Sequence, residues 1–319
     1  MDAHAEAGPT RARIALGLLT IYVVWGSTFA AVAIAVRDLP PLVAMGLRHV
    51  TAGTILLGWS ARRPGALREI GRRQLLAATL FGGMLFLGSH GALAWAQQTV
   101  PSGVAALLIA SIPLWMATLD RVVFGKRLHP LAYAGLLSGF AGIALLVDPF
   151  GAGWVDRLGA AVIVLSALSW AAGSLYSRGA PLPRTPLVSA GLAALCGGIL
   201  LLTVGAATGE WKDVTFTADA LGAVAYLIVV GTLVGFVSYV WLLQHAATSL
   251  VSTYAYANPV VAVVLGWAFL GEDVTWSMLT AGALIVCSVA LIVATSGAEL
   301  ERGRGLRRRR VAEAEAHSS

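Results

Sequence analysis

Long runs of apolar residues, separated by short breaks of charged residues, Pro and Gly, follow one another along almost the whole chain. A helix needs about 20 residues to cross the ~30 Å hydrocarbon core of a bilayer. Ten runs approach that length, and the connections between them are short, so the pattern predicts an all-α polytopic membrane protein without a soluble domain. The ten predicted spans are 14–36, 42–60, 75–96, 102–124, 131–147, 158–176, 187–207, 221–243, 250–270 and 276–295.

Composition supports this interpretation. The chain is 58% hydrophobic and 12% charged, whereas soluble domains carry about 25% charged residues. The first apolar run is longer than the core of a signal peptide and is therefore taken as the first span. Cys196 and Cys287 lie in separate apolar runs without metal-site spacing, so we expect core packing and neither a metal nor a cofactor.

The charges predict an orientation. With the N-terminus in the cytoplasm, the inner segments hold 18 basic residues, and the outer loops hold only Arg37, Arg157 and Lys212 together with eight acids. Such asymmetry follows the positive-inside rule, so both termini should lie on the cytoplasmic side of the inner membrane. The net charge of +6 then reflects this inner face, and no nucleic-acid partner is expected. The basic tail, 296–319, should lie against anionic lipid.

The chain also matches itself. At an offset of 145, Trp25 meets Trp170 and "PLVAMGL" from Pro41 meets "PLVSAGL". At an offset of 146, Pro113 meets Pro259. Shared Trp and Pro at one nearly constant offset indicate two related halves.

Each half, 14–147 and 158–295, contains five spans, and an odd number of crossings inverts the second half relative to the first. Inverted repeats recur in secondary transporters, where the exchange of conformations between the halves opens a central site to one side and then to the other. The pattern therefore predicts a transporter of small molecules. A membrane enzyme is disfavoured because the six His are scattered and no H-E-x-x-H or P-loop motif occurs.

Four segments resemble the drug/metabolite transporter superfamily, in particular its ten-helix EamA-type exporters. They are "VVWGSTFAA", "LPPLVAMGLRHVTAG", "GALAWAQQTVPSGVAALLIASIPLWMATLDRVVFGKRL" and "LQHAATSLVSTYAYANPVVAVVLGWAFLGE". The resemblance covers about 14–295. It implies a basket of ten helices around a central cavity and the export of small metabolites, amino acids or drugs. Lys126 stands in the first half where the second carries Glu272, which departs from the family's Gly-Glu ending.

The ninth predicted span carries the first candidate substrate-binding residues. Pro259 should kink this helix and free backbone groups near residue 255, which lipid tolerates only against protein or a wet cavity. Tyr254 and Asn258 share a helix face and would offer a hydroxyl and an amide to a substrate. The alternative is a kink that only shapes packing, with the polar groups bonded between helices. In the paired helix, Pro113 should kink beside Ser111, at the same repeat position.

Arg48 is the only Lys or Arg well inside a span, and His90 lies at a similar depth. A charge at that depth should face the protein interior. The pair would bind an anionic substrate group or relay protons, or else Arg48 caps carbonyls or pairs with an outer acid such as Asp38. We expect a structural role for His49. No span carries Asp or Glu near its centre, so proton coupling would have to use His90, a boundary acid or the substrate's own charge.

Trp25 and Trp170, at matched positions, complete the predicted site as cavity walls, together with Ser27 from the "WGSTFA" segment. Gly135 and Gly139, four residues apart, form a small-residue face that would serve either internal packing or a homodimer. Apart from lipid and a small-molecule substrate, no other partner is indicated. Import or exchange of a polar metabolite such as a nucleoside or organic anion, a channel and a non-transporting scaffold remain alternatives.

Overall fold

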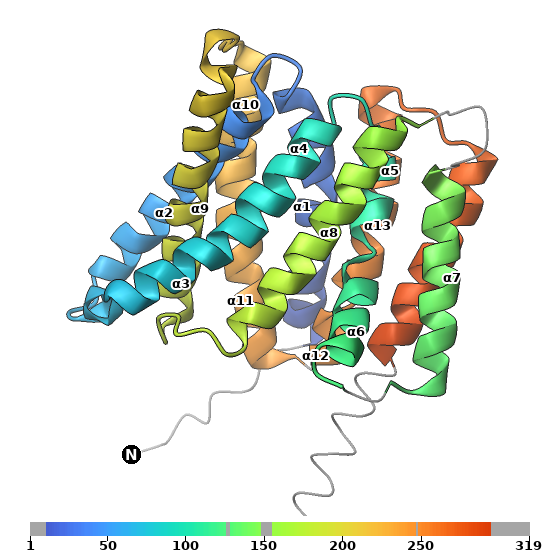
Figure 1. Ribbon diagram of the computed structural model, residues 1–319, viewed down its shortest axis with the longest axis horizontal. Helices are drawn as coiled ribbons and strands as arrows, with labels where there is room; N and C mark the ends of the chain where they lie inside the picture. The colour runs from blue at the N-terminus through green and yellow to red at the C-terminus, as the bar shows by residue number, and fades with distance from the viewer. Residues whose placement is uncertain (1–10, 126–127, 148–154, 247, 295–319) are drawn as a thin grey trace, which may run out of the picture.

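A computed structural model describes residues 11–125, 128–147, 155–246 and 248–294, and all regular structure within these ranges is helical (Figure 1). The predicted tail, 296–319, and Lys126 lie outside the described residues. The first half contains α1 Arg11–Ala35, α2 Pro41–Ala61, η1 Ala66–Glu69, α3 Arg72–Gly82, η2 Gly83–Gly91, α4 Ala92–Ala96, α5 Ser102–Ile109, α6 Ile112–Val122 and α7 Pro130–Val147. The second contains α8 Arg157–Ser177, α9 Pro186–Thr208, η3 Glu210–Lys212, α10 Ala218–Tyr226, η4 Leu227–Val234, α11 Gly235–His245, α12 Thr248–Val251, α13 Tyr254–Leu270 and a last helix, Trp276–Ala294.

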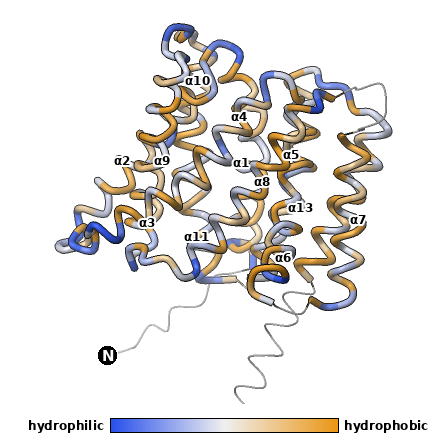
Figure 2. The backbone as a smooth tube through the Cα atoms, viewed as in Figure 1, coloured by the Kyte–Doolittle hydropathy of each residue, from blue (hydrophilic) through white to orange (hydrophobic). Residues whose placement is uncertain are grey.

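These helices form rods that run between two polar ends. Within the described residues nine rods are long and apolar enough to cross a membrane, and Tyr254–Leu270 is a shorter apolar helix. Figure 2 shows apolar residues along the rods and hydrophilic residues gathered at the two ends and connections. The predicted all-α membrane fold is confirmed, and its ten spans correspond to these nine rods and the shorter one.

Local chemistry explains where many helices begin and end. Pro41, Pro130 and Pro186 begin α2, α7 and α9, where the missing N–H of Pro has no helical partner to lose. Asp156 caps α8 by accepting the N–H groups of Leu158 and Gly159, as an N-cap carboxylate does.

The two halves interlock along matching helices. α2 packs along α9, which is the second helix of the other half. The first helix of each half packs against the fourth span of the other: α1 contacts α13, and α8 contacts α5 and α6. The first helices also contact the third spans of the opposite half, because α1 lies against α10, η4 and α11 while α8 lies against η2 and α4.

The third span of each half contains a wide, π-helical segment, η2 and η4, at corresponding places. Such segments are rare and often lie at functional sites. Their recurrence in both halves shows that the repeat extends to an irregular feature of the backbone.

Both predicted proline-containing spans are interrupted, but not in the same way. The fourth span breaks at Ala110 and Ser111, just before Pro113. The ninth breaks at Ser252 and Thr253, and α13 continues through Pro259. The break of the ninth span therefore lies further from Pro259 than the break of the fourth span lies from Pro113, and the kink at Pro259 stays a prediction.

The small-residue face of α7 packs inside the molecule. The Gly135 carbonyl accepts a hydrogen bond from Ser288 Oγ at 2.5 Å, and a Cβ placed on Gly139 would lie 2.2 Å from a methyl carbon of Leu114 and 2.4 Å from Ser288 Oγ. Of the two interpretations of this face, the structure supports internal packing with the last helix.

Candidate functional site

Polar and aromatic side chains gather in two places between the halves. The first group, called here the histidine cluster, consists of Arg48, His49, Phe86, His90 and Trp170. The second, called the tyrosine cluster, consists of Tyr22, Trp25, Tyr239, Tyr254 and Asn258. Of the eight predicted site residues, six belong to these clusters.

The histidine cluster is built around a direct contact between two imidazoles. His49 Nε2 lies 2.9 Å from His90 Nδ1, which is hydrogen-bonding distance, and the rings are 21° from parallel with centroids 5.0 Å apart. His49 is fully buried, with 1% of its surface exposed. The structural role expected for His49 stays a prediction, and the structure places this residue in contact with both Phe86 and His90.

Aromatic rings close both sides of the imidazole pair. Phe86 packs on His49 with ring centroids 4.1 Å apart, and Trp170 stacks on His90 at 5.1 Å and 29°. The four rings thus form a row that runs from Phe86 and His49 through His90 to Trp170. Only Trp170, in α8, belongs to the second half. Trp170 meets His90 as a stacking surface.

Arg48 is buried in the same region, with 7% of its surface exposed. Its Nε donates to Thr232 Oγ1 in η4 at 3.3 Å. Asp38, the acid weighed as its partner, instead accepts a hydrogen bond from Thr217 Oγ1 at 2.7 Å. Among the described residues no carboxylate lies within ion-pair distance of Arg48.

The tyrosine cluster joins α1, α11 and α13. The Trp25 ring lies 5.3 Å from Tyr239 and 4.9 Å from Tyr254, the latter edge-on at 82°. Gly235 makes room for this indole, since a Cβ there would lie 2.4 Å from Trp25 Nε1. In an edge-to-face contact the positive edge of one ring meets the negative face of the other, which stabilises the packing of these side chains.

Asn258 ties the two halves together at this cluster. In the amide orientation that satisfies its neighbours, its Nδ2 donates to the Tyr254 carbonyl at 3.2 Å and to the Tyr22 carbonyl of α1 at 3.3 Å. Beside it, the hydroxyl groups of Tyr22 and Thr253 are hydrogen-bonded to each other. These contacts are those of an interhelical bridge, one of the two interpretations given for this residue.

The remaining two predicted residues lie apart from the clusters. Ser27 donates to the Val24 carbonyl at 2.9 Å and contacts the Tyr226 hydroxyl at 2.6 Å. Ser111 is fully buried and donates to the Leu108 carbonyl at 2.6 Å, where it satisfies a backbone group at the break of its span. The structure does not bring Ser111 to the other predicted residues.

One turn of α1 separates the two clusters. Thr28 Oγ1 donates to the Trp25 carbonyl at 2.6 Å. Thr28 also faces Gly231 of η4, where a Cβ would lie 3.0 Å from its methyl carbon and 3.6 Å from Arg48 Nη2. The π-helical segment therefore stands between the tyrosine cluster and the guanidinium group.

Apart from Trp25 and Trp170, which correspond to each other, the residues of the two clusters do not recur in the other half. At the offsets of the repeat, Arg48 and His49 correspond to Ala193 and Ala194, and His90 corresponds to Gly235 or Phe236. In the tyrosine cluster the counterparts of Tyr22, Tyr239, Tyr254 and Asn258 are Ala167, Leu93, Leu108 and Ile112. Residues that only serve the shared fold should recur in both halves, so side chains present in one half alone point to chemistry specific to this protein.

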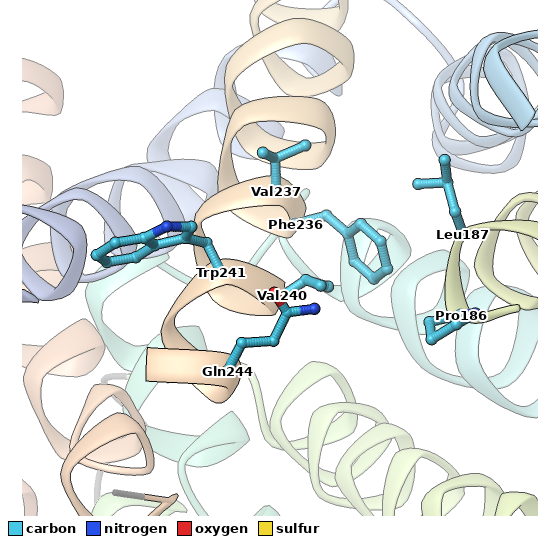
Figure 3. A pocket seen from close by; sticks show the side chains of 7 residues that line it. All are labelled: Pro186, Leu187, Phe236, Val237, Val240, Trp241 and Gln244. Carbon is cyan, nitrogen blue, oxygen red and sulfur yellow. The ribbon is translucent and has the colours of Figure 1, made fainter. Parts of the chain in front are cut away.

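A separate shallow pocket opens between the start of α9 and α11 (Figure 3). Its wall is apolar except for one amide, which suits lipid or an apolar ligand more than a charged one. None of the predicted site residues line it. The lining residues are Pro186, Leu187, Phe236, Val237, Val240, Trp241 and Gln244.

Ten helical rods, a repeated arrangement and interior polar clusters define a multi-pass membrane protein of the transporter class. The sequence pattern of the EamA-like transporter family matches residues 12–148 and again residues 157–294, so it covers both halves. The chain belongs to the EamA-like transporter family and is a membrane transporter, as its resemblance to the drug/metabolite transporters implied.

Several relatives are similar over most of their length. The "Uncharacterized inner membrane transporter YedA" of Escherichia coli (strain K12) is 33% identical over 276 residues, which is 86% of this chain and 89% of that protein. The "Uncharacterized transporter YvbV" of Bacillus subtilis (strain 168) is 25% identical over 93% of this chain and 96% of its own. "Protein PecM" of Dickeya dadantii (strain 3937) is 26% identical over 85% and 88%.

A solved crystal structure has the same fold. It superposes with a TM-score of 0.60 at 22% identity and covers 88% of this chain and 96% of its own.

Proposed function

We propose that this transporter moves small metabolites, amino acids or drugs out of the cell across the inner membrane by alternating access, with both termini in the cytoplasm. Eighteen basic residues at the end assigned to the cytoplasm support this orientation. A relative described as an inner membrane transporter supports the location.

The observation that carries the proposal is the pair of polar and aromatic clusters between the halves. Each cluster takes residues from both: Arg48, His49 and His90 meet Trp170, and Trp25 meets Tyr239 and Tyr254. A site whose walls belong to two halves changes its access when the halves move relative to each other. Reciprocal packing of each first helix on the opposite half supports the inverted arrangement that this mechanism requires.

The proposed substrate site has two parts, one at Arg48, His90 and Trp170 and the other, beyond η4, at Trp25 and Tyr254. Asn258 and Ser27 position its helices through their bonds to Tyr22 and Tyr226. Aromatic walls with one fixed cation suit a small zwitterion or an aromatic metabolite, because stacking area and a single charge are the contacts that the site can offer. Ser111 supports the break of the fourth span.

Counterflow in proteoliposomes tests this function. Vesicles containing the purified protein are loaded with a mixed panel of amino acids, nucleosides, organic acids and cationic dyes, and the entry of each labelled compound is followed. We expect saturable exchange of at least one compound, which vesicles without protein lack. Exchange of none would contradict transport, and conductance in planar bilayers that does not saturate would indicate a channel.

A further inference from the structure

We infer that the histidine cluster is a combined anion and proton site, so that the substrate is an organic carboxylate that travels together with one proton. This inference rests on the proposed function and narrows it to one substrate class. It is carried by three features of the cluster: an uncompensated guanidinium, a hydrogen-bonded imidazole pair, and aromatic faces on both sides of that pair.

The guanidinium of Arg48 has no carboxylate within ion-pair distance among the described residues. Arginine offers five N–H donors and remains charged, yet among the described residues its only hydrogen bond runs from Nε to Thr232 Oγ1. A buried charge at this depth of a membrane needs a counter-charge or water. The two Nη atoms are free to make the paired contacts that arginine forms with a carboxylate.

The imidazole pair can hold one extra proton and no more. In the contact between His49 Nε2 and His90 Nδ1 one nitrogen must donate and the other must accept, so two doubly protonated rings would place N–H against N–H. The other nitrogen of His49, Nδ1, is buried without a partner. Among the described residues His90 Nε2 has no hydrogen-bond partner either, so the pair has sites at which a proton can be exchanged.

The charges around the imidazole pair make its protonation depend on whether an anion is bound to Arg48. Burial opposes a positive charge on the imidazole pair, and the charge of Arg48, the neighbour of His49 on α2, opposes it further. Among the described residues η2, η4, α8 and α9 bring aromatic, hydroxyl and apolar groups to the pair and no acid. A carboxylate on Arg48 cancels the opposing charge, and the indole face of Trp170 then favours an imidazolium in His90.

The resulting step is balanced. A carboxylate and a proton enter from the same aqueous side. The carboxylate binds Arg48, and the proton binds whichever outer nitrogen of the pair, His49 Nδ1 or His90 Nε2, carries no hydrogen. Both leave on the other side when the halves have moved, Arg48 stays protonated throughout, and no net charge crosses the membrane.

Ligand binding to the purified full chain in nanodiscs tests this inference. The probes are indole-3-acetate and benzoate, with the uncharged amides of both acids as controls, and affinity is measured at about pH 6 and about pH 8, on either side of the ordinary histidine range. We expect both acids to bind and the amides to bind at least about tenfold more weakly. Because one proton is taken up with each anion, the dissociation constant should rise by up to about tenfold for each pH unit.

Variants separate the two parts of the site. Arg48→Gln should weaken binding of both acids by at least about tenfold, Arg48→Lys should restore part of it, and Arg37→Gln, at an exposed arginine, should change nothing. The double variant His49→Gln/His90→Gln, or either single variant if the double does not fold, should bind the acids with little dependence on pH. His245→Gln, at an exposed histidine of α11, should keep the wild-type pH dependence.

Three results would overturn the inference: no acid binding at about pH 6, equal binding of acids and amides, or a pH dependence that survives in the histidine variants. Transport of a neutral or cationic compound without any carboxylate binding would also overturn it and would leave the proposed function standing. Failure of counterflow with every compound of the panel would instead overturn the proposed function.

Discussion

The carboxylate of Glu210, the first residue of η3, accepts the backbone N–H of Leu42 at 3.0 Å and that of Val43 at 3.2 Å at the start of α2. Glu69, which follows α2, makes the reciprocal contact: it accepts the N–H of Thr185 at 3.1 Å and its hydroxyl at 2.9 Å at the start of α9. Each half therefore supplies a carboxylate that caps the N-terminus of a helix in the other half.

A third carboxylate acts in the same way. Glu272, which follows α13, accepts the N–H groups of Ser102 at 2.6 Å and Gly103 at 3.0 Å at the start of α5. Free N–H groups and the helix dipole make a helix start a favourable place for negative charge. The Gly-Glu ending of the second repeat thus serves a contact between the halves, and Lys126 in the first repeat could not accept such bonds.

Glu69→Gln should lower the melting temperature at neutral pH. Hydrogen bonds from the backbone and side chain of Thr185 lower the pKa of Glu69 in the folded protein. The stability that this group contributes is therefore fully present above its ordinary pKa and is lost as the pH falls through the lowered folded value. The melting temperatures of the wild type and of Glu69→Gln, measured from neutral to acidic pH, should converge in acid. A difference that stays constant with pH would contradict a role for the negative charge of Glu69.

Glu210→Gln should behave differently. Burial raises the pKa of Glu210, and the bonds from Val43 and Leu42 oppose this only in part. The folded state then favours the protonated group, so its contribution to stability is present below the ordinary pKa and is lost as the pH rises through the raised value. At neutral pH we expect the variant to melt at or slightly above the wild-type temperature. A clear fall at neutral pH would show that the charged cap outweighs the cost of burial.

Gly82→Ala should destabilise the contact between α3 and α9. A Cβ at Gly82 would lie 2.3 Å from the carbonyl oxygen of Ala193, which belongs to a helix backbone and cannot move aside alone. Forced overpacking of this kind costs about 1–3 kcal/mol, measurable in thermal melts in detergent. Gly222→Ala is the matched control, because a Cβ there meets nothing within 4 Å, and it should stabilise the helix by about 0.5–1 kcal/mol. If Gly82→Ala melted at the same temperature as the wild type, the close approach of α3 to α9 at Gly82 would be contradicted.

Hydropathy and charge were sufficient to predict the ten spans, because a membrane leaves the backbone few alternatives to helices. They could not predict the π-helical segments η2 and η4, since no residue type marks a wide turn as Pro marks a kink. The break at Ser252 and Thr253 was also missed. α13 tolerates Pro259, and the side-chain amide of Asn258 bonds backbone carbonyls beside it.

Single residues of the site were predicted more readily than their partners. Depth within a span identified Arg48 and His90, because a charged or polar group at that depth is costly unless it faces the protein interior. His49 was missed because its contact with His90 depends on how α2 is rotated against η2, which no pattern in one sequence specifies. The absence of Arg48, His49 and His90 from the second repeat is a signal that could have marked all three.

Asn258→Ala should slow efflux by about three- to twentyfold while the protein still inserts, because its amide joins α13 of the second half to the Tyr22 carbonyl of α1. A hydrogen bond between membrane helices is worth about 0.6–1.7 kcal/mol. Efflux rates in proteoliposomes and melting temperatures should be measured together. Thr203→Ala removes an exposed hydroxyl that bonds only within its own helix and should leave both unchanged. Wild-type efflux in Asn258→Ala would exclude a transport role for this bridge.

Cysteine labelling should place the connections after α1 and α9 outside the cell and those after α2 and α8 in the cytoplasm. The native thiols Cys196 and Cys287 are first replaced by Ala. Exposed Arg37 and Asp213 then serve as the outer positions for single cysteines, and Arg63 serves as an inner one.

The physical reason is that basic loops are retained on the inner side during insertion. An impermeant maleimide should therefore modify Arg37→Cys and Asp213→Cys in intact cells, and Arg63→Cys only after permeabilisation. Labelling of Arg63→Cys in intact cells would reverse the orientation, and labelling of Arg37→Cys without Asp213→Cys would contradict the odd number of crossings in each half on which alternating access depends.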